Sequence, residues 1–268
     1  MPKRLLVGDI MKQQGQFKLF DDWKEFKTWL DKQTIKRKIK TIQQHHTWSP
    51  NYSHSLHHFQ LCQNMKTYHT TSAGMTDIAQ NITTFKDGKV MVCRSLEKNP
   101  AGIYGQNSGA ICIEHVANFD SDIMTSEHKE CILGVTASLC MKFGLDVNKD
   151  TIVYHHWFDL NTGKRTNGTG STKTCPGTKF FGGNKVSNAE ASFYPLVRGY
   201  IEKFKNPVKK EEPPVKKEEP EMWKKNIVKE ALSLGLITDE SWIDKADEGA
   251  TVWFVLAVMI NLFKKLKG

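Results

Sequence analysis

The segment AICIEHVANFDSDIMTSEHKECILGVTASLCMKFGLDVNKDTIVYHHWF (Ala110–Phe158) contains, in order, the patterns of a strand, a helix and a second strand. Ala110–His115 is short and mostly apolar, which favours a strand. Glu127–Phe143 carries apolar residues at helical spacing and is followed by Gly144, a common helix terminator. Thr151–Phe158 is rich in β-branched and aromatic residues and therefore predicts another strand.

The same alternation of helices and strands extends on both sides of this segment. The remaining predicted elements are helices at Asp21–Lys32, His54–His69 and Ala189–Lys203, a strand at Lys38–His46, and two strands that meet at Asp87-Gly88 within Asp77–Val92. An Asp-Gly pair between apolar runs is a hairpin signal. Alternating helices and strands with one hairpin predict an α/β fold whose mixed central β-sheet is flanked by helices.

A tandem repeat marks a domain boundary. PVKKEEP occupies Pro207–Pro213 and recurs immediately at Pro214–Pro220. Proline with balanced charges cannot bury apolar area and favours an extended, semi-rigid linker. We therefore predict a first domain over residues 1–206, a linker over 207–221 and a second domain over 222–268.

The second domain is predicted to be a small all-α module. Trp223–Ile237 has an amphipathic helical pattern, and Ala250–Lys267 predicts a second, more hydrophobic helix. The apolar run Ala250–Phe263 is 14 residues long, whereas a membrane span needs roughly 20. Because a unit of this size is only marginally stable alone, we expect it to form a homodimer through these helices or to dock on the first domain.

Composition excludes some protein classes. The chain has 268 residues and six cysteines without regular spacing, which is not a disulfide framework. The amino-terminal sequence MPKRLLVGDIMKQQGQF has no sustained apolar segment and does not resemble a secretory signal. These features predict synthesis in the cytoplasm.

The charge is distributed unevenly. The formal net charge is +9, yet residues 207–268 carry equal numbers of basic and acidic side chains, so the excess lies in residues 1–206. Such an asymmetry suggests a polyanionic partner, namely nucleic acid, anionic lipid or an anionic wall polymer, although it also serves plain solubility. No groove-reading motif supports a nucleic-acid partner.

Residues of hydrolytic metal sites are spread along the first domain. Two histidine doublets, His45–His46 and His155–His156, stand at the ends of predicted strands. Glu114 lies in a predicted strand between the doublets. Lys173 and Cys175 follow the second doublet, in the segment GSTKTCPG. One imidazole from each doublet and a thiolate make a ligand set for catalytic Zn²⁺. Glu114 would accept the proton of the attacking water, and Lys173 would stabilise an oxyanion.

Each of these residues has an ordinary alternative interpretation. A lone histidine is most often a structural residue, Glu114 alone would be a salt-bridge carboxylate, Lys173 a solvated loop lysine and Cys175 a bystander. Strand alternation sends adjacent side chains to opposite faces, so one histidine of each doublet is expected to be a ligand. The periodicity does not indicate which histidine of each doublet is the ligand.

Five segments in order give the chain a family resemblance: HHTW (His45–Trp48), DIAQNITTFKDG (Asp77–Gly88), NSGAICIEHVANFD (Asn107–Asp120), IVYHH (Ile152–His156) and TKTCPG (Thr172–Gly177). Together they resemble the zinc-dependent N-acetylmuramoyl-L-alanine amidases, with the type 2 amidase fold of phage lysozymes and peptidoglycan-recognition proteins. The resemblance covers most of the first domain and is closest to endolysins of phages and prophages of Gram-positive spore-formers.

The resemblance implies a role for each matching residue. His45, His155 and Cys175 fall on the family's three zinc ligands, Glu114 on its strand glutamate, and Lys173 on its lysine two positions before the third ligand. It also implies cleavage of the amide between N-acetylmuramic acid and L-alanine in peptidoglycan of a Gram-positive wall.

Two departures accompany the resemblance. Gln80 and Asn81 stand where many members carry Tyr-His, so no tyrosine role is carried over. Asp159–Thr172 is longer than in many members; it would line a substrate groove or be a flexible surface insertion.

Several functions remain open from the sequence. The alternatives to an amidase are a non-catalytic peptidoglycan-binding protein and a zinc peptidase that acts on peptidoglycan cross-links. The second domain weakly resembles one surface-layer-homology-type repeat, which implies binding to the wall or a secondary wall polymer, and the alternative is a membrane anchor. An endolysin of this kind would act on the wall after release from the cytoplasm.

Overall fold

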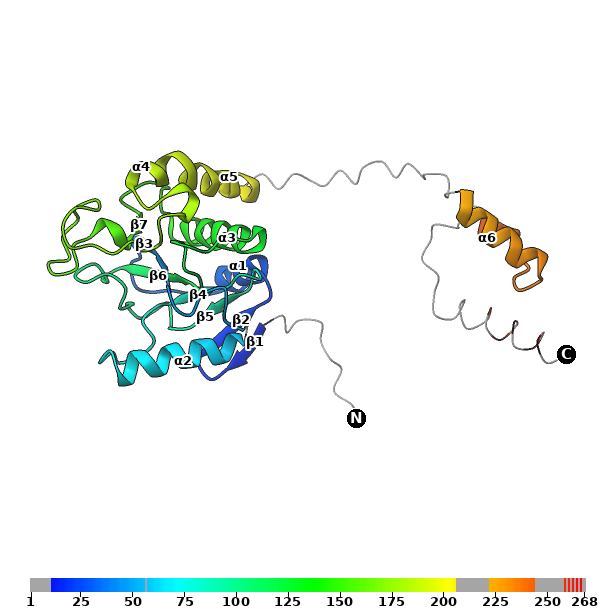
Figure 1. Ribbon diagram of the computed structural model, residues 1–268, viewed down its shortest axis with the longest axis horizontal. Helices are drawn as coiled ribbons and strands as arrows, with labels where there is room; N and C mark the ends of the chain where they lie inside the picture. Colours follow the sequence, from blue (N-terminus) through cyan, green and yellow to red (C-terminus); the bar gives the residue numbers. More distant parts are fainter. Residues whose placement is uncertain are drawn as a thin grey trace. The chain divides into compact units, whose positions relative to one another are not determined.

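The computed structural model describes residues 11–55, 57–205 and 222–243, together with positions 258, 260, 262, 264 and 266. The chain divides into two compact units, Met1–Asn206 and Pro207–Gly268. Each unit is described by itself (Figure 1). The linker predicted over 207–221 lies outside the described residues.

The first unit is built on a seven-stranded sheet in the order β1-β2-β5-β4-β6-β3-β7. The strands are β1 (Met11–Gln14), β2 (Phe17–Phe20), β3 (Thr41–His46), β4 (Ile82–Thr84), β5 (Val90–Val92), β6 (Ala110–His115) and β7 (Ile152–Tyr154). β4, β6, β3 and β7 run parallel, whereas β1, β2, β5 and β4 pair antiparallel. The predicted mixed sheet with flanking helices is confirmed.

Helices cover both faces of this sheet (Figure 1). They are α1 (Trp23–Asp31), α2 (His58–Thr71), α3 (Ser126–Phe143), α4 (Val186–Asn188) and α5 (Tyr194–Lys205), with a π-helical turn η3 (Ala189–Phe193) between α4 and α5. Asp22 begins α1 by accepting hydrogen bonds from two backbone amides, and Gly144 ends α3 with φ of 63°. These ends follow the preferences of helix caps.

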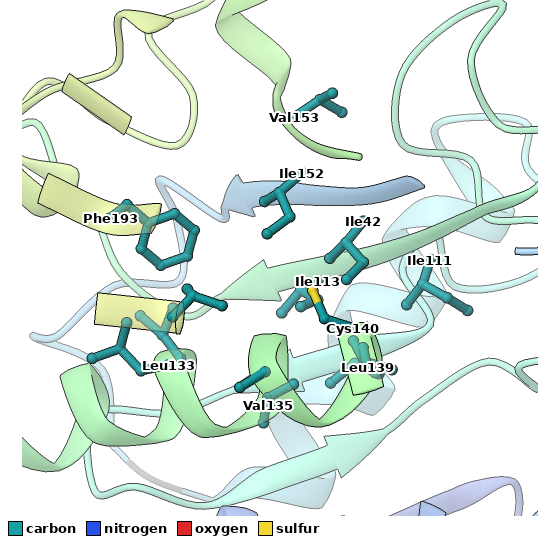
Figure 2. Close-up of a cluster of buried hydrophobic side chains, with 14 of the residues drawn as sticks. Ile42, Ile111, Ile113, Leu133, Val135, Leu139, Cys140, Ile152, Val153 and Phe193 are labelled. Carbon is teal, nitrogen blue, oxygen red and sulfur yellow. The ribbon is translucent and has the colours of Figure 1, made fainter. Parts of the chain in front are cut away.

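Two hydrophobic clusters lie on opposite faces of the sheet. On one face, Ile42, Ile111 and Ile113 point toward Leu133 and Val135 of α3 (Figure 2). On the other face, α2 packs its apolar side chains against β2 and β5. A cleft opens on this second face of the sheet, beside α2.

The structure corrects one expectation and adds a hairpin. The prediction of strand over Thr151–Phe158 is wrong beyond Tyr154, because His155–Trp157 form the 3₁₀ turn η1 and the amide of His156 bonds the carbonyl of Cys175 at 2.7 Å. The amino-terminal hairpin of β1 and β2 was not predicted, since its strands are four residues long and β1 is mostly polar.

The second unit contains α6 (Met222–Ser233) and the 3₁₀ turn η4 (Glu240–Ile243). The helix predicted over Trp223–Ile237 thus ends a few residues early, near Gly235 with φ of 63°. Most of the helix predicted over Ala250–Lys267 lies outside the described residues. Among the described helices, none has the length and apolar character that crossing a membrane requires.

Candidate metal centre

The carboxyl ends of β3 and β6 place His45 beside Glu114. The two residues are register partners on adjacent parallel strands, as are His46 and His115. Side chains alternate along a strand, so His45 and Glu114 leave one face of the sheet while His46 leaves the other. In open α/β sheets, this end of parallel strands is where ligands bind.

His155 reaches the same place from the turn η1 that follows β7. The ring centroids of His45 and His155 are 4.8 Å apart. The alternation argument holds for the first doublet but not for the second, since His155 and His156 belong to a turn. The His156 ring bonds the carbonyl of Lys173 at 2.6 Å and so turns away toward the following loop.

Cys175 completes the cluster from a loop without regular secondary structure. Its side chain is 5% exposed, although the flanking sequence is polar and glycine-rich. The backbone amide of His46 donates to its Sγ at 3.4 Å. A donor directed at sulfur favours the thiolate form that binds metal ions.

The residues present fit a metal ion. Donor atoms of His45, His155 and Cys175 all lie within 4.8 Å of one another. The Nε2 atom of His45 is buried without a hydrogen-bond partner, so its lone pair is not used by another protein group. Two imidazoles and one thiolate are a donor set that Zn²⁺ prefers and that leaves a fourth position open.

The surroundings keep both imidazoles neutral. Burial holds the pKa of His45 well below its usual range, and the nearby His155, His115 and Lys173 lower it further. Burial, assisted by Lys173, lowers the pKa of His155 to about 4. Neutral imidazole is the form that ligates metals.

The thiol of Cys175, unlike the two imidazoles, is held in the protonated form, which does not bind metal ions. Burial, together with the charge of Glu114, raises its pKa well above the usual range. A metal ion must therefore displace a proton from Cys175 on binding, and its affinity is expected to rise with pH.

Glu114 has the environment of an acid–base group. Burial raises the pKa of its carboxyl to about 8, and the charge of Lys173 acts in the opposite direction. A carboxyl in a cleft whose pKa is shifted by burial and tuned by a specific cation is a candidate acid–base group.

These residues stand in a cleft of about 830 Å³. The predicted residues that line it are His45, Glu114, His155, Lys173 and Cys175, and α2 supplies one wall through Leu61, Asn64, Met65, Tyr68 and His69. No residue of Asp159–Thr172 is among the described residues that line it. That loop instead packs beside Gln106, whose amide donates to the carbonyl of Gly163 at 2.9 Å.

Sequence reasoning missed Cys112 and Gly102. Donor atoms of His45, Cys112 and Glu114 also lie within 4.8 Å of one another. Cys112 is two residues before Glu114 on β6, so strand alternation could have placed it on the same face. Gly102 lies so close that a Cβ there would be 3.1 Å from Nε2 of His45, and no pattern in the sequence signals this contact.

Gln80 and Asn81 serve the fold rather than the cleft. Asn81 donates to the carbonyls of Ser95 and Lys98 and accepts from the amide of Cys112. Both residues are fully buried. The departure from the Tyr-His pattern therefore leaves a structural pair at this position.

The model of one protein family, described as N-acetylmuramoyl-L-alanine amidase, matches residues 35–178. The chain belongs to this family. The match spans the three candidate ligands as well as Glu114 and Lys173, and it confirms the resemblance to the N-acetylmuramoyl-L-alanine amidases that was inferred from the sequence. No match was found among curated proteins.

Solved structures with similar folds include amidases and recognition proteins. The endolysin N-acetylmuramoyl-L-alanine amidase LysCS from Clostridium intestinale is 19% identical, with a TM-score of 0.42, over 54% of this chain and 78% of that chain. Drosophila PGRP-LB is 16% identical, with a TM-score of 0.45, over 56% and 81% of the two chains. Drosophila peptidoglycan recognition protein SA is 19% identical, with a TM-score of 0.45, over 59% and 81%.

Proposed function

We propose that the protein is a zinc-dependent peptidoglycan hydrolase that cleaves the amide between N-acetylmuramic acid and L-alanine. The observation that carries the proposal is the convergence of His45, His155 and Cys175 within 4.8 Å, in a chain that belongs to the N-acetylmuramoyl-L-alanine amidase family. The pairing of Glu114 with His45 supports it further.

The proposed mechanism divides the work among the residues of the cleft. His45, His155 and Cys175 would hold the zinc ion, which supplies an activated water and polarises the scissile carbonyl. The Glu114 carboxylate accepts the proton of the attacking water and returns it to the departing amine of L-alanine. The ammonium group of Lys173 stabilises the negative charge that develops on the carbonyl oxygen.

The test measures both the zinc content of the protein and the chemical structure of the products that it releases. Wild type is expected to hold one zinc ion per chain and to release muropeptides with a free L-alanine amino terminus from purified Gram-positive walls. Cys175→Ser is expected to lose both properties. Cys140→Ala, which changes a buried cysteine of α3 on the other face of the sheet, is expected to keep both.

Other outcomes separate the alternatives. Zinc binding without hydrolysis of several walls would favour a peptidoglycan-binding protein. New amino groups without a free lactyl carboxyl on muramic acid would favour a peptidase that acts on cross-links. Wild type without zinc, and full activity in Cys175→Ser, would refute the metal centre.

We also propose that the second unit binds the Gram-positive wall or a secondary wall polymer. The proline- and charge-rich repeat before α6 supports this, because a tether raises the local concentration of an enzyme on its polymer. Peptidoglycan lies outside the cell membrane, so the enzyme would act after release from the cytoplasm. Sedimentation with walls should be weaker for a chain that ends at Lys205, and analytical ultracentrifugation tests the proposed homodimer.

A further inference from the structure

Two residues of the cleft, Lys173 and Cys175, stand on a loop that belongs to no strand or helix. The segment Ser171–Lys179 has no regular secondary structure. Its position is therefore set by hydrogen bonds from other parts of the fold. The ligand position of Cys175 depends on those bonds, whereas that of His45 is fixed by the ladder of β3 and β6.

On the β7 side, backbone and side-chain groups hold the loop. The amide of His156 donates to the carbonyl of Cys175 at 2.7 Å, and the Asn184 amide group donates to the carbonyl of Thr174 at 2.8 Å. The first bond joins the loop to the turn that carries His155, and the second joins it to the segment between η2 (Phe180–Gly182) and α4. They do not join it to the strand that carries Glu114.

On the β6 side, one carboxylate spans the loop. The Thr174 hydroxyl donates to Oδ2 of Asp120 at 2.6 Å, and the Thr178 amide donates to Oδ1 at 2.7 Å. The two bonded residues lie one position before and three positions after Cys175. Hydrogen bonds to a charged acceptor are shorter and stronger than neutral ones.

Asp120 is itself fixed relative to the rest of the centre. It stands in the turn that follows β6, where its amide donates to Oδ1 of Asn118 at 3.1 Å. The neighbouring amide of Phe119 donates to Nδ1 of His46 at 3.0 Å, next to His45 on β3. The carboxylate therefore links the loop of Cys175 to the strands of His45 and Glu114.

We propose that Asp120 is a positioning residue, which acts through Thr174 and Thr178 to hold Cys175 at its place beside His45 and His155. The inference rests on the proposed zinc centre but concerns a residue outside the ligand set. Partners of this kind, which orient a metal ligand without touching the metal, commonly contribute about 10–100-fold to metal affinity.

The first experiment measures zinc affinity by competition with a chromogenic chelator. Asp120→Ala is expected to bind zinc roughly tenfold more weakly than wild type. Asp22→Ala is the matched control, because Asp22 likewise accepts from two backbone amides, those of Lys24 and Glu25, at the start of α1 and outside the cleft lining. Its zinc affinity is expected to equal that of wild type.

A double-mutant cycle tests the route through Thr174. Thr174→Val removes the hydroxyl and keeps the shape, so it should weaken zinc binding less than Asp120→Ala does. In the double variant, the loss should be close to that of Asp120→Ala alone, because both changes break the same bond. If Asp120→Ala does not fold, Thr174→Val alone carries the test. If the fold-losses in zinc affinity of the two single variants multiplied in the double variant, Asp120 would not act through Thr174.

The second readout is independent of zinc. In metal-free protein, the alkylation rate of Cys175 by iodoacetamide, resolved by mass spectrometry, should rise in Asp120→Ala and stay unchanged in Asp22→Ala. A wild type that binds no zinc would refute the proposed function, yet this rate would still report on the loop. Folded Asp120→Ala with wild-type zinc affinity and wild-type alkylation would overturn the inference.

Discussion

His45 of β3 and Glu114 of β6 are register partners in the parallel part of the sheet, and their side chains leave its same face. The separation of the candidate ligand from the candidate base is therefore set by backbone hydrogen bonds of the ladder. Cys175 and Lys173 come to this pair on a loop. The centre thus joins residues fixed by the sheet to residues of a loop that is held by backbone and side-chain hydrogen bonds to distant segments.

Glu114→Gln should separate catalysis from metal binding. The amide keeps the size of the carboxyl but cannot accept a proton, so kcat on wall substrate should fall by about 10²–10⁴. Zinc content should stay at the wild-type value, since Glu114 is not a proposed ligand. Glu130→Gln, an exposed change on α3, serves as the control. A kcat within threefold of wild type would exclude Glu114 as the base.

The main features of the fold and the centre could be predicted from the sequence. Strand alternation and apolar periodicity are local properties, so the mixed sheet and the hairpin at Asp87-Gly88 followed from short patterns. The ordered family motifs identified His45, His155 and Cys175, which the structure brings together. The ligand roles themselves stay a prediction.

What the sequence did not predict depends on contacts between distant segments. The turn at His155 follows from a bond between His156 and Cys175, nineteen positions along the chain, which no local pattern contains. The contact of Asp120 with Thr174 spans 54 positions. The close approach of Gly102 to His45 is likewise visible only once the chain is folded.

Lys173→Gln should lower the rate without changing the metal. In the proposed mechanism its charge acts on the oxygen that becomes negative in the transition state, so the loss should appear in kcat, about 10²-fold, rather than in KM. Lys185→Gln removes another exposed lysine, outside the cleft lining, and should leave both constants unchanged. A KM about 10²-fold higher with an unchanged kcat would assign Lys173 to substrate binding instead.

A buried chain of polar groups predicts acid sensitivity. The Tyr52 hydroxyl contacts Nδ1 of His128, and Oγ1 of Thr84 contacts both Nε2 of His128 and Nδ1 of His115, each at 2.7 Å. The other ring nitrogen of His115 contacts Oε1 of Gln44 at 2.9 Å. Burial lowers the pKa of His128 to about 3 and holds that of His115 well below its usual range.

The sign of the pH effect follows from these shifts. Between pH 6.5 and about 3 the unfolded chain binds a proton at His128, whereas the folded chain does not. The free energy of unfolding should therefore decrease as pH falls below 6.5, by up to about 1.4 kcal/mol per pH unit for this residue. His128→Gln should be less stable at pH 7 but show a shallower decline, measured by urea unfolding from pH 7 to pH 5. Parallel curves for the two proteins would contradict this.

Gly102→Ala should damage the centre through a single methyl group. A Cβ at Gly102 would lie 2.3 Å from Oε1 of Gln43, 3.0 Å from Sγ of Cys112 and 3.1 Å from Nε2 of His45. Because these groups are buried, the methyl must displace the Gln43 amide and crowd the His45 ring. Overpacking of this kind costs about 1–3 kcal/mol of unfolding free energy, and zinc binding should weaken with it.

The control for this change is another glycine with open space. Gly199 lies in α5, where a Cβ would meet nothing within 4 Å. Gly199→Ala should leave zinc affinity unchanged and raise the unfolding free energy by up to about 1 kcal/mol, since alanine favours helix. Urea unfolding and chelator competition on both variants separate a local effect at His45 from the general cost of an added methyl. If Gly102→Ala bound zinc as tightly as Gly199→Ala, the position of the His45 ring would not depend on the space that Gly102 leaves.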